Sequence, residues 1–148
     1  ETDIIRKTDL LREKVAERLA ELSRDGFAGA VVDDLLKGGQ RTAQVDVSID
    51  QRSNITLVIA RGEDAVWVEF GAGVHYNGSA GTSPHPKGSE LGFTIGGYGK
   101  GMGKKDVWGF YEDGKLRLTH GAPATMPMYN AVKTVCDEIA EIAREEFQ

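Results

Sequence analysis

The sequence predicts an α+β fold: an N-terminal helix, an antiparallel sheet of about four to five strands with a long glycine-rich loop, and a C-terminal helix packed on the sheet. Apolar residues recur at helical spacing near both ends of the chain and alternate with polar residues between them. The alternating runs are joined by short turns, which favours an antiparallel meander. Residues 1–148 are expected to form a single domain, because the length suits one core and no linker interrupts it.

The first helix is predicted over residues 4–22. Its apolar residues lie three or four positions apart, and charged residues fill the other face. These apolar residues are Ile4, Ile5, Leu11, Val15, Leu19 and Leu22. Gly26 is expected to end the helix, and a second short helix is expected over residues 30–37, closed by Gly38 and Gly39.

Three strands are predicted next, over residues 43–49, 55–59 and 65–70, where apolar and polar side chains alternate. In the third run Val66, Val68 and Phe70 would face the core. Trp67 would then stand beside Glu69 on the outer face. A large indole in that position needs a cover, either a helix of its own chain or another subunit.

Two further strands are predicted around an Asp-Gly turn. Residues 107–111 and 116–119 flank Glu112-Asp113-Gly114-Lys115, and Asp-Gly between two apolar runs is a strong hairpin signal.

A glycine-rich segment spans residues 71–105 and contains eleven glycines and two prolines. A stretch of this length without regular structure is usually functional, disordered or ordered only on binding. It carries few charges and several aromatic and aliphatic residues, unlike a charge-driven disordered tail. We therefore expect an adhesive loop that extends from the sheet, with a short strand over residues 91–95.

The last helix is predicted from apolar residues spaced four and three apart: Met128, Val132, Val135, Ile139 and Ile142. Thr125 is its expected N-cap, and Pro127 is tolerated in its first turn. A coiled-coil seam is the alternative, but the pattern covers only about two heptads, so packing on the sheet is preferred.

The composition argues against some classes of function for this protein. With 18 basic and 23 acidic residues the formal charge is −5, which repels nucleic acid and argues against sequence-specific binding to it. A local cationic patch at Lys100, Lys104 and Lys105 keeps nucleic-acid binding as an alternative. The lone Cys136 fits a reducing compartment such as the bacterial cytoplasm. The chain is expected to be soluble, with no membrane partner, because it lacks an apolar run of spanning length and starts unlike a signal peptide.

Two motifs that suggest nucleotide binding or nucleophilic catalysis fail on spacing. In the glycine cluster of residues 96–105, Tyr98 stands where a phosphate-binding loop needs its first glycine, and Lys105 follows Lys104 in place of Ser or Thr. Residues 77–81 resemble a nucleophile elbow but begin with Asn77. We therefore predict no cofactor and no catalytic residue.

The histidines do not predict a metal site. His75, His85, His120 and Cys136 stand too far apart in sequence for a recognisable zinc pattern. His85 lies between two prolines, which favours an extended, exposed conformation and a surface role. One enzymatic alternative remains, a small-molecule or phosphate-ester enzyme in which the glycine-rich loop closes as a lid and His75, His85 and Lys104 supply polar contacts.

Three short motifs occur in a fixed order: VEFGAG at residues 68–73, SPHP at 83–86, and GAPATMPMYNA at 121–131, where the last helix begins. Together, over about residues 4–147, they resemble the small tail-component family of long-tailed bacteriophages, whose members are regarded as tail-completion or head–tail joining proteins. Ala72 and Met128 stand where that family usually has Thr and Phe.

The resemblance implies a phage or prophage structural protein without catalytic activity, cofactor or metal. Members of that family are similar to proteins that form hexameric rings, so the resemblance implies a homo-oligomer. The implied partners are the head connector and the tail-tube or tail-terminator proteins, and the implied location is the tail or neck of the virion.

We expect the glycine-rich loop to become ordered against a neighbouring subunit or the tail tube. The candidate assembly-interface residues are Trp67, Glu69, Gly71, Gly73, Tyr76, His85, Pro86, Phe93 and Tyr98.

Overall fold

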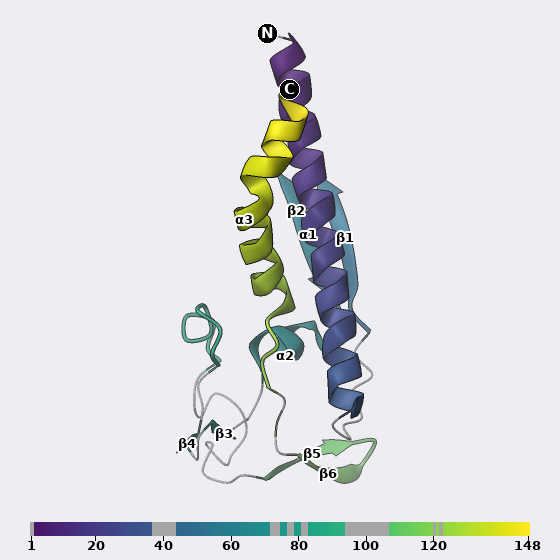
Figure 1. Ribbon diagram of the computed structural model, residues 1–148. Helices are drawn as coiled ribbons and strands as arrows, with labels where there is room; N and C mark the ends of the chain where they lie inside the picture. Colours follow the sequence, from purple (N-terminus) through teal and green to yellow (C-terminus); the bar gives the residue numbers. More distant parts are fainter. Residues whose placement is uncertain are drawn as a thin grey trace. The chain divides into compact units, whose positions relative to one another are not determined.

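The computed structural model describes residues 2–36, 44–71, 75–76, 79–80, 83–93, 107–119, 121 and 123–148. Its elements are α1 (Thr2–Leu36), β1 (Asp46–Gln51), β2 (Thr56–Arg61), α2 (Ala65–Phe70), β3 (His75–Tyr76), β4 (Ser79–Ala80), β5 (Trp108–Glu112), β6 (Lys115–Thr119) and α3 (Pro127–Glu146) (Figure 1). This is the predicted α+β class. Contacts group the chain into two compact units: unit 1 comprises Glu1–Ala65 and Pro127–Gln148, and unit 2 comprises Val66–Met126.

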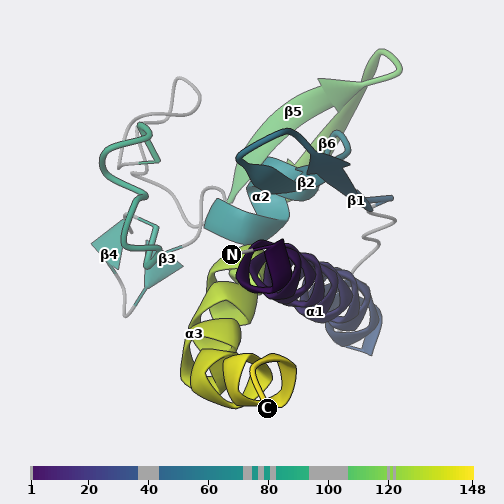
Figure 2. The ribbon, with the colours of Figure 1, turned by 90° about the horizontal axis from the view of Figure 1, so that it is seen from above.

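Unit 1 is built on α1, with α3 along one side of it and the β1–β2 hairpin along another (Figures 1 and 2). The most buried positions of α1 recur every three or four residues: Ala16, Ala20, Ser23, Phe27 and Ala30. Those of α3 are Pro127, Ala131 and Val135. The expectation that α3 packs on a sheet is therefore wrong, because small side chains on both helices let α3 pack on α1.

Gly26 does not end α1, and no separate second helix forms, because α1 continues as one helix to Leu36. A Cβ atom at Gly26 would lie 2.8 Å from the Cβ of Pro127. Because Gly26 has no side chain, α1 can pack closely against the start of α3 at this position. Gly29, three residues further along α1, has no such contact, since nothing lies within 4 Å of a Cβ placed there.

The predicted apolar stripe of α1 differs from the buried one. Ile4 and Ile5 are 64% and 59% exposed, and Leu11, Val15 and Leu19 are only half-buried. The small residues beside this stripe occupy the deeper positions because α1 has neighbours on two sides.

The β1–β2 hairpin confirms two predicted strands, shifted slightly towards the C-terminus. The pairing is antiparallel, from Asp46 opposite Arg61 to Gln51 opposite Thr56. Arg24 on α1 fixes the hairpin, because its guanidinium donates from Nε and Nη2 to the carbonyl oxygen of Val47, at 3.3 and 3.2 Å.

Two ion pairs join α1 to α3. Arg18 donates two hydrogen bonds to Glu138, from Nε to Oε2 at 2.9 Å and from Nη2 to Oε1 at 3.0 Å. Hydrogen bonding by Arg18 holds the pKa of Glu138 below its usual value, and Glu138 in turn raises the pKa of Arg18. Lys14 pairs with Glu146, which raises the pKa of the lysine.

The prediction of a third strand is wrong, because residues 65–70 form the short helix α2. The sheet of four to five strands is also wrong. Throughout the described ranges strands pair only in twos, as β1–β2, β3–β4 and β5–β6. In the predicted strand at 91–95, residues 91–92 form a turn, Phe93 has no regular secondary structure, and residues 94–95 lie outside the described ranges.

The Asp-Gly hairpin is confirmed as β5–β6, with Glu112 opposite Lys115. Asp113 and Gly114 both have positive φ, 50° and 74°, as a type I′ turn requires.

Candidate functional site

The candidate site lies in unit 2, around α2. Gly71 ends this helix: it has a φ of 74°, and its N–H donates to the carbonyl oxygen of Trp67 at 2.8 Å. This is the left-handed glycine cap of a helix C-terminus. Gly71, the first residue of the predicted glycine-rich loop, therefore follows a helix and not the expected strand.

Glu69 on α2 contacts His85 in the next motif. The two side chains are buried, with relative exposures of 8% and 7%, and the distance from Oε1 of Glu69 to Nε2 of His85 is 3.2 Å. The backbone N–H of Lys87 donates to Nδ1 of His85 at 3.0 Å, so Nδ1 carries no proton. The imidazole is therefore the neutral tautomer that donates from Nε2 to the carboxylate of Glu69.

Aromatic rings pack around this pair. The ring of Phe70 stacks on that of Phe93, with centroids 4.4 Å apart and planes at 18°, and lies 4.3 Å from the imidazole of His85. Trp67 meets Phe93 edge to face at 6.2 Å. Offset stacking and edge-to-face contacts are favourable ring geometries. Phe93 therefore supplies, from the same chain, part of the cover that Trp67 was expected to need.

Backbone hydrogen bonds close residues 83–93 into a compact loop. The N–H of Ser83 donates to the carbonyl oxygen of Phe93 at 3.1 Å, and the N–H of Phe93 donates to that of Gly88 at 2.8 Å. The N–H of Gly88 donates in turn to the carbonyl oxygen of His85 at 2.8 Å. A Cβ at Gly88 would lie 2.7 Å from the Cβ of Ser83, so the tight crossing needs glycine. This part of the glycine-rich segment is folded, with His85 on its inner side.

The third motif also reaches α2. The backbone N–H and the hydroxyl of Thr125 both donate to the carbonyl oxygen of Val68, at 3.0 and 3.1 Å. Val68 is fully buried. The predicted N-cap residue of the last helix thus bonds a different helix. Met126, with a φ of 52°, separates it from Pro127, where α3 begins.

Residues 67–71, 83–93 and 125 thus form one hydrogen-bonded and aromatic assembly, which we call the motif knot. Nε2 of His85 and Oε1 of Glu69 form a hydrogen bond with each other, and the ring of Phe70 packs against the imidazole. A histidine and a carboxylate buried in this manner fix a loop on a helix.

The structure brings six of the candidate interface residues together in the motif knot: Trp67, Glu69, Gly71, His85, Pro86 and Phe93. Glu69 and His85 were expected at the surface and are buried instead, because each satisfies the other. Pro86 is exposed beside them.

Other residues named from the sequence are described less fully. Gly73, Tyr98 and Lys104 lie outside the described residues, as does the glycine cluster 96–105. Only the backbone of His75 and Tyr76 is described; it forms β3, which pairs with β4. The role of Thr125 was missed, since a threonine before a helix is a common N-cap and nothing local indicates a distant carbonyl as its partner.

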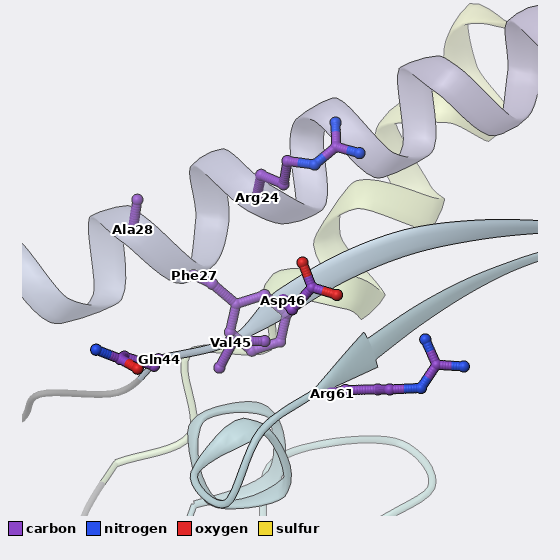
Figure 3. A pocket seen from close by; sticks show the side chains of 7 residues that line it. All are labelled: Arg24, Phe27, Ala28, Gln44, Val45, Asp46 and Arg61. Carbon is purple, nitrogen blue, oxygen red and sulfur yellow. The ribbon is translucent and has the colours of Figure 1, made fainter.

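Unit 1 carries an open groove of about 520 Å³ between α1 and the β1–β2 hairpin (Figure 3). Arg24, Asp46 and Arg61 supply its charges, and Phe27 is its largest apolar side chain. Both arginines already have partners: Arg24 donates to Val47, and Nη1 of Arg61 donates to the hydroxyl of Ser48 at 2.6 Å. The groove is thus bordered by residues that fasten the hairpin.

Among the described residues, no three histidine, cysteine, aspartate or glutamate side chains cluster closely enough to hold a metal ion. Within the same part of the chain, no helix has the length and apolarity needed to cross a membrane. No protein-family model matches the sequence, and neither a curated protein nor a solved structure shows significant similarity to it.

Proposed function

We propose that this chain is a structural protein of a long-tailed phage or prophage particle, a tail-completion or head–tail joining component. It acts by assembling into a ring at the interface between the head connector and the tail. Its partners are other copies of itself, the head connector and the tail-tube or tail-terminator proteins.

The motif knot is the observation that carries this proposal. The resemblance to the tail-component family rests on three motifs, at residues 68–73, 83–86 and 121–131. Glu69 of the first motif bonds His85 of the second, and Val68 of the first bonds Thr125 of the third. The residues that carry the resemblance are thus also the residues that hold this part of unit 2 together, which supports treating the three motifs as one feature.

The chemistry of the motif knot also favours a structural role. The polar side chains of Glu69 and His85 are buried and bonded to each other, and neither is presented to solvent as a catalytic acid or base would be. The excess of acidic residues suits a ring around a DNA channel, because cationic walls would bind passing phosphates.

An extract experiment tests the proposal. A lysate of the phage or prophage with this gene deleted should contain separate heads and tails, and adding the purified chain should restore joined particles. An unrelated acidic protein of similar size serves as control. If the added chain leaves heads and tails separate, the joining function is wrong.

A further inference from the structure

The β5–β6 hairpin exposes an uncharged apolar face. Tyr111 is paired with Leu116 and Gly109 with Leu118, so these four residues lie on one side of the ladder. We call them the hairpin face. Its large side chains are among the most exposed apolar groups of the described residues: Tyr111 is 76%, Leu118 71% and Leu116 57% exposed. A two-stranded hairpin with such a face is marginally stable unless another surface covers it.

Unit 1 offers an apolar groove of about 330 Å³, the helix groove. It is lined chiefly by Leu11, Val15 and Leu19 of α1, Val58 of β2 and Ile139 of α3. The three α1 residues belong to the apolar stripe that the sequence shows most clearly, yet they are only half-buried. The stripe therefore borders an open groove within unit 1.

Charge favours pairing between the two units of different copies. Unit 1 contains eighteen acidic and twelve basic residues, a net charge of −6, whereas unit 2 contains five acidic and six basic residues, a net charge of +1. Two copies of unit 1 repel each other, but unit 1 of one copy attracts unit 2 of another. Net charge therefore favours a surface of unit 2 as the partner for the helix groove, and the hairpin face is an apolar surface of that unit.

We propose that the hairpin face of one copy binds the helix groove of a second copy. The contact is head-to-tail, because it joins two different surfaces. Each bound copy still has one unused surface, so the contact extends into a ring or an open chain. The closure of these contacts into a ring rests on the proposed function. The contact itself can be tested on the isolated full-length chain.

Sedimentation velocity of two complementary variants tests the contact. Leu118→Glu places a charge on the hairpin face, and Val15→Glu places one in the helix groove. We expect wild type to form species larger than a dimer as its concentration rises, and each variant alone to associate at least tenfold more weakly. A mixture of the two variants should form 1:1 dimers and nothing larger, because one intact hairpin face and one intact helix groove remain.

Val32→Glu is the matched control, since Val32 is an exposed apolar residue of α1 that does not line the helix groove. It should associate like wild type. Thr8→Lys, at an exposed position lining the helix groove, replaces Val15→Glu if circular dichroism shows that variant to be unfolded.

Three results would overturn the contact: a wild-type chain that stays monomeric at high concentration, a single variant that associates like wild type, or a mixture that stays monomeric. The proposed function fails separately. Normal self-association together with no restoration of joined particles would leave the contact intact and reject the joining role.

Discussion

His85 stabilises unit 2 through both ring nitrogens, one accepting from Lys87 N–H and the other donating to Glu69. We expect His85→Ala to lower the free energy of unfolding by about 1–3 kcal/mol, because it removes a donor from a buried carboxylate. Urea unfolding followed by the fluorescence of Trp67 and Trp108 measures the change.

Lys87→Ala is the control for that variant. The lysine side chain is 64% exposed, and its contribution to the loop comes from the backbone N–H, which alanine keeps. Its effect should stay within about 0.5 kcal/mol. A His85→Ala protein as stable as the Lys87→Ala protein would show that the buried pair contributes little.

Two glycines of α1 give opposite expectations. Gly26→Ala should destabilise unit 1 by about 1–3 kcal/mol, since the new methyl group would overlap Pro127. Gly29→Ala should stabilise it by up to about 1 kcal/mol, because alanine favours helix and meets no atom there. Equilibrium denaturation of both variants is the measurement. A shift of the same sign and size in both would contradict close packing at Gly26.

At the scale of elements, the pair of Arg18 and Glu138 makes the packing of α1 on α3 depend on pH. The folded-state pKa of Glu138 is lowered, so its contribution is complete above the usual carboxyl pKa of 4.5 and is lost as the pH falls through the lowered value. Glu138→Gln should therefore destabilise the protein at about pH 7 and have much less effect at about pH 3.

Thermal unfolding of Glu138→Gln at several pH values checks this, with Glu141→Gln, at an exposed position of α3, as the matched control. Equal destabilisation by Glu138→Gln at both pH values would mean that Arg18 does not lower the pKa of the carboxyl group.

Elements with local signals could be predicted from the sequence, and elements decided by distant contacts could not. Asp113-Gly114 specifies its own turn, so the β5–β6 hairpin was predictable. Residues 65–70 alternate like a strand, yet they form a helix whose end is capped by Gly71 and whose Val68 carbonyl bonds the distant Thr125. Gly26 likewise indicates a helix end locally, whereas its packing against Pro127 is a tertiary contact.

The candidate site followed the same rule. The sequence indicated Trp67, Glu69, His85 and Phe93 as one group of residues, but it placed Glu69 and His85 at the surface. A polar side chain without partners would be exposed, and burial becomes favourable here because the two side chains bond each other and the N–H of Lys87 bonds the second ring nitrogen of His85. Contacts between residues sixteen positions apart have no local signature.

At the scale of the whole molecule, each copy combines an acidic unit 1 with a slightly basic unit 2. If the joining role and the head-to-tail contact belong together, a charge on the hairpin face should stop particles from forming, whereas a charge at Val32 should not.

Counting joined particles by electron microscopy tests that role most directly. The gene is deleted from the phage or prophage and resupplied as wild type, Leu118→Glu or Val32→Glu. We predict joined particles with wild type and Val32→Glu, and separate heads and tails with Leu118→Glu and with no resupplied gene. Joined particles at the wild-type number in the absence of the gene would contradict the proposed function.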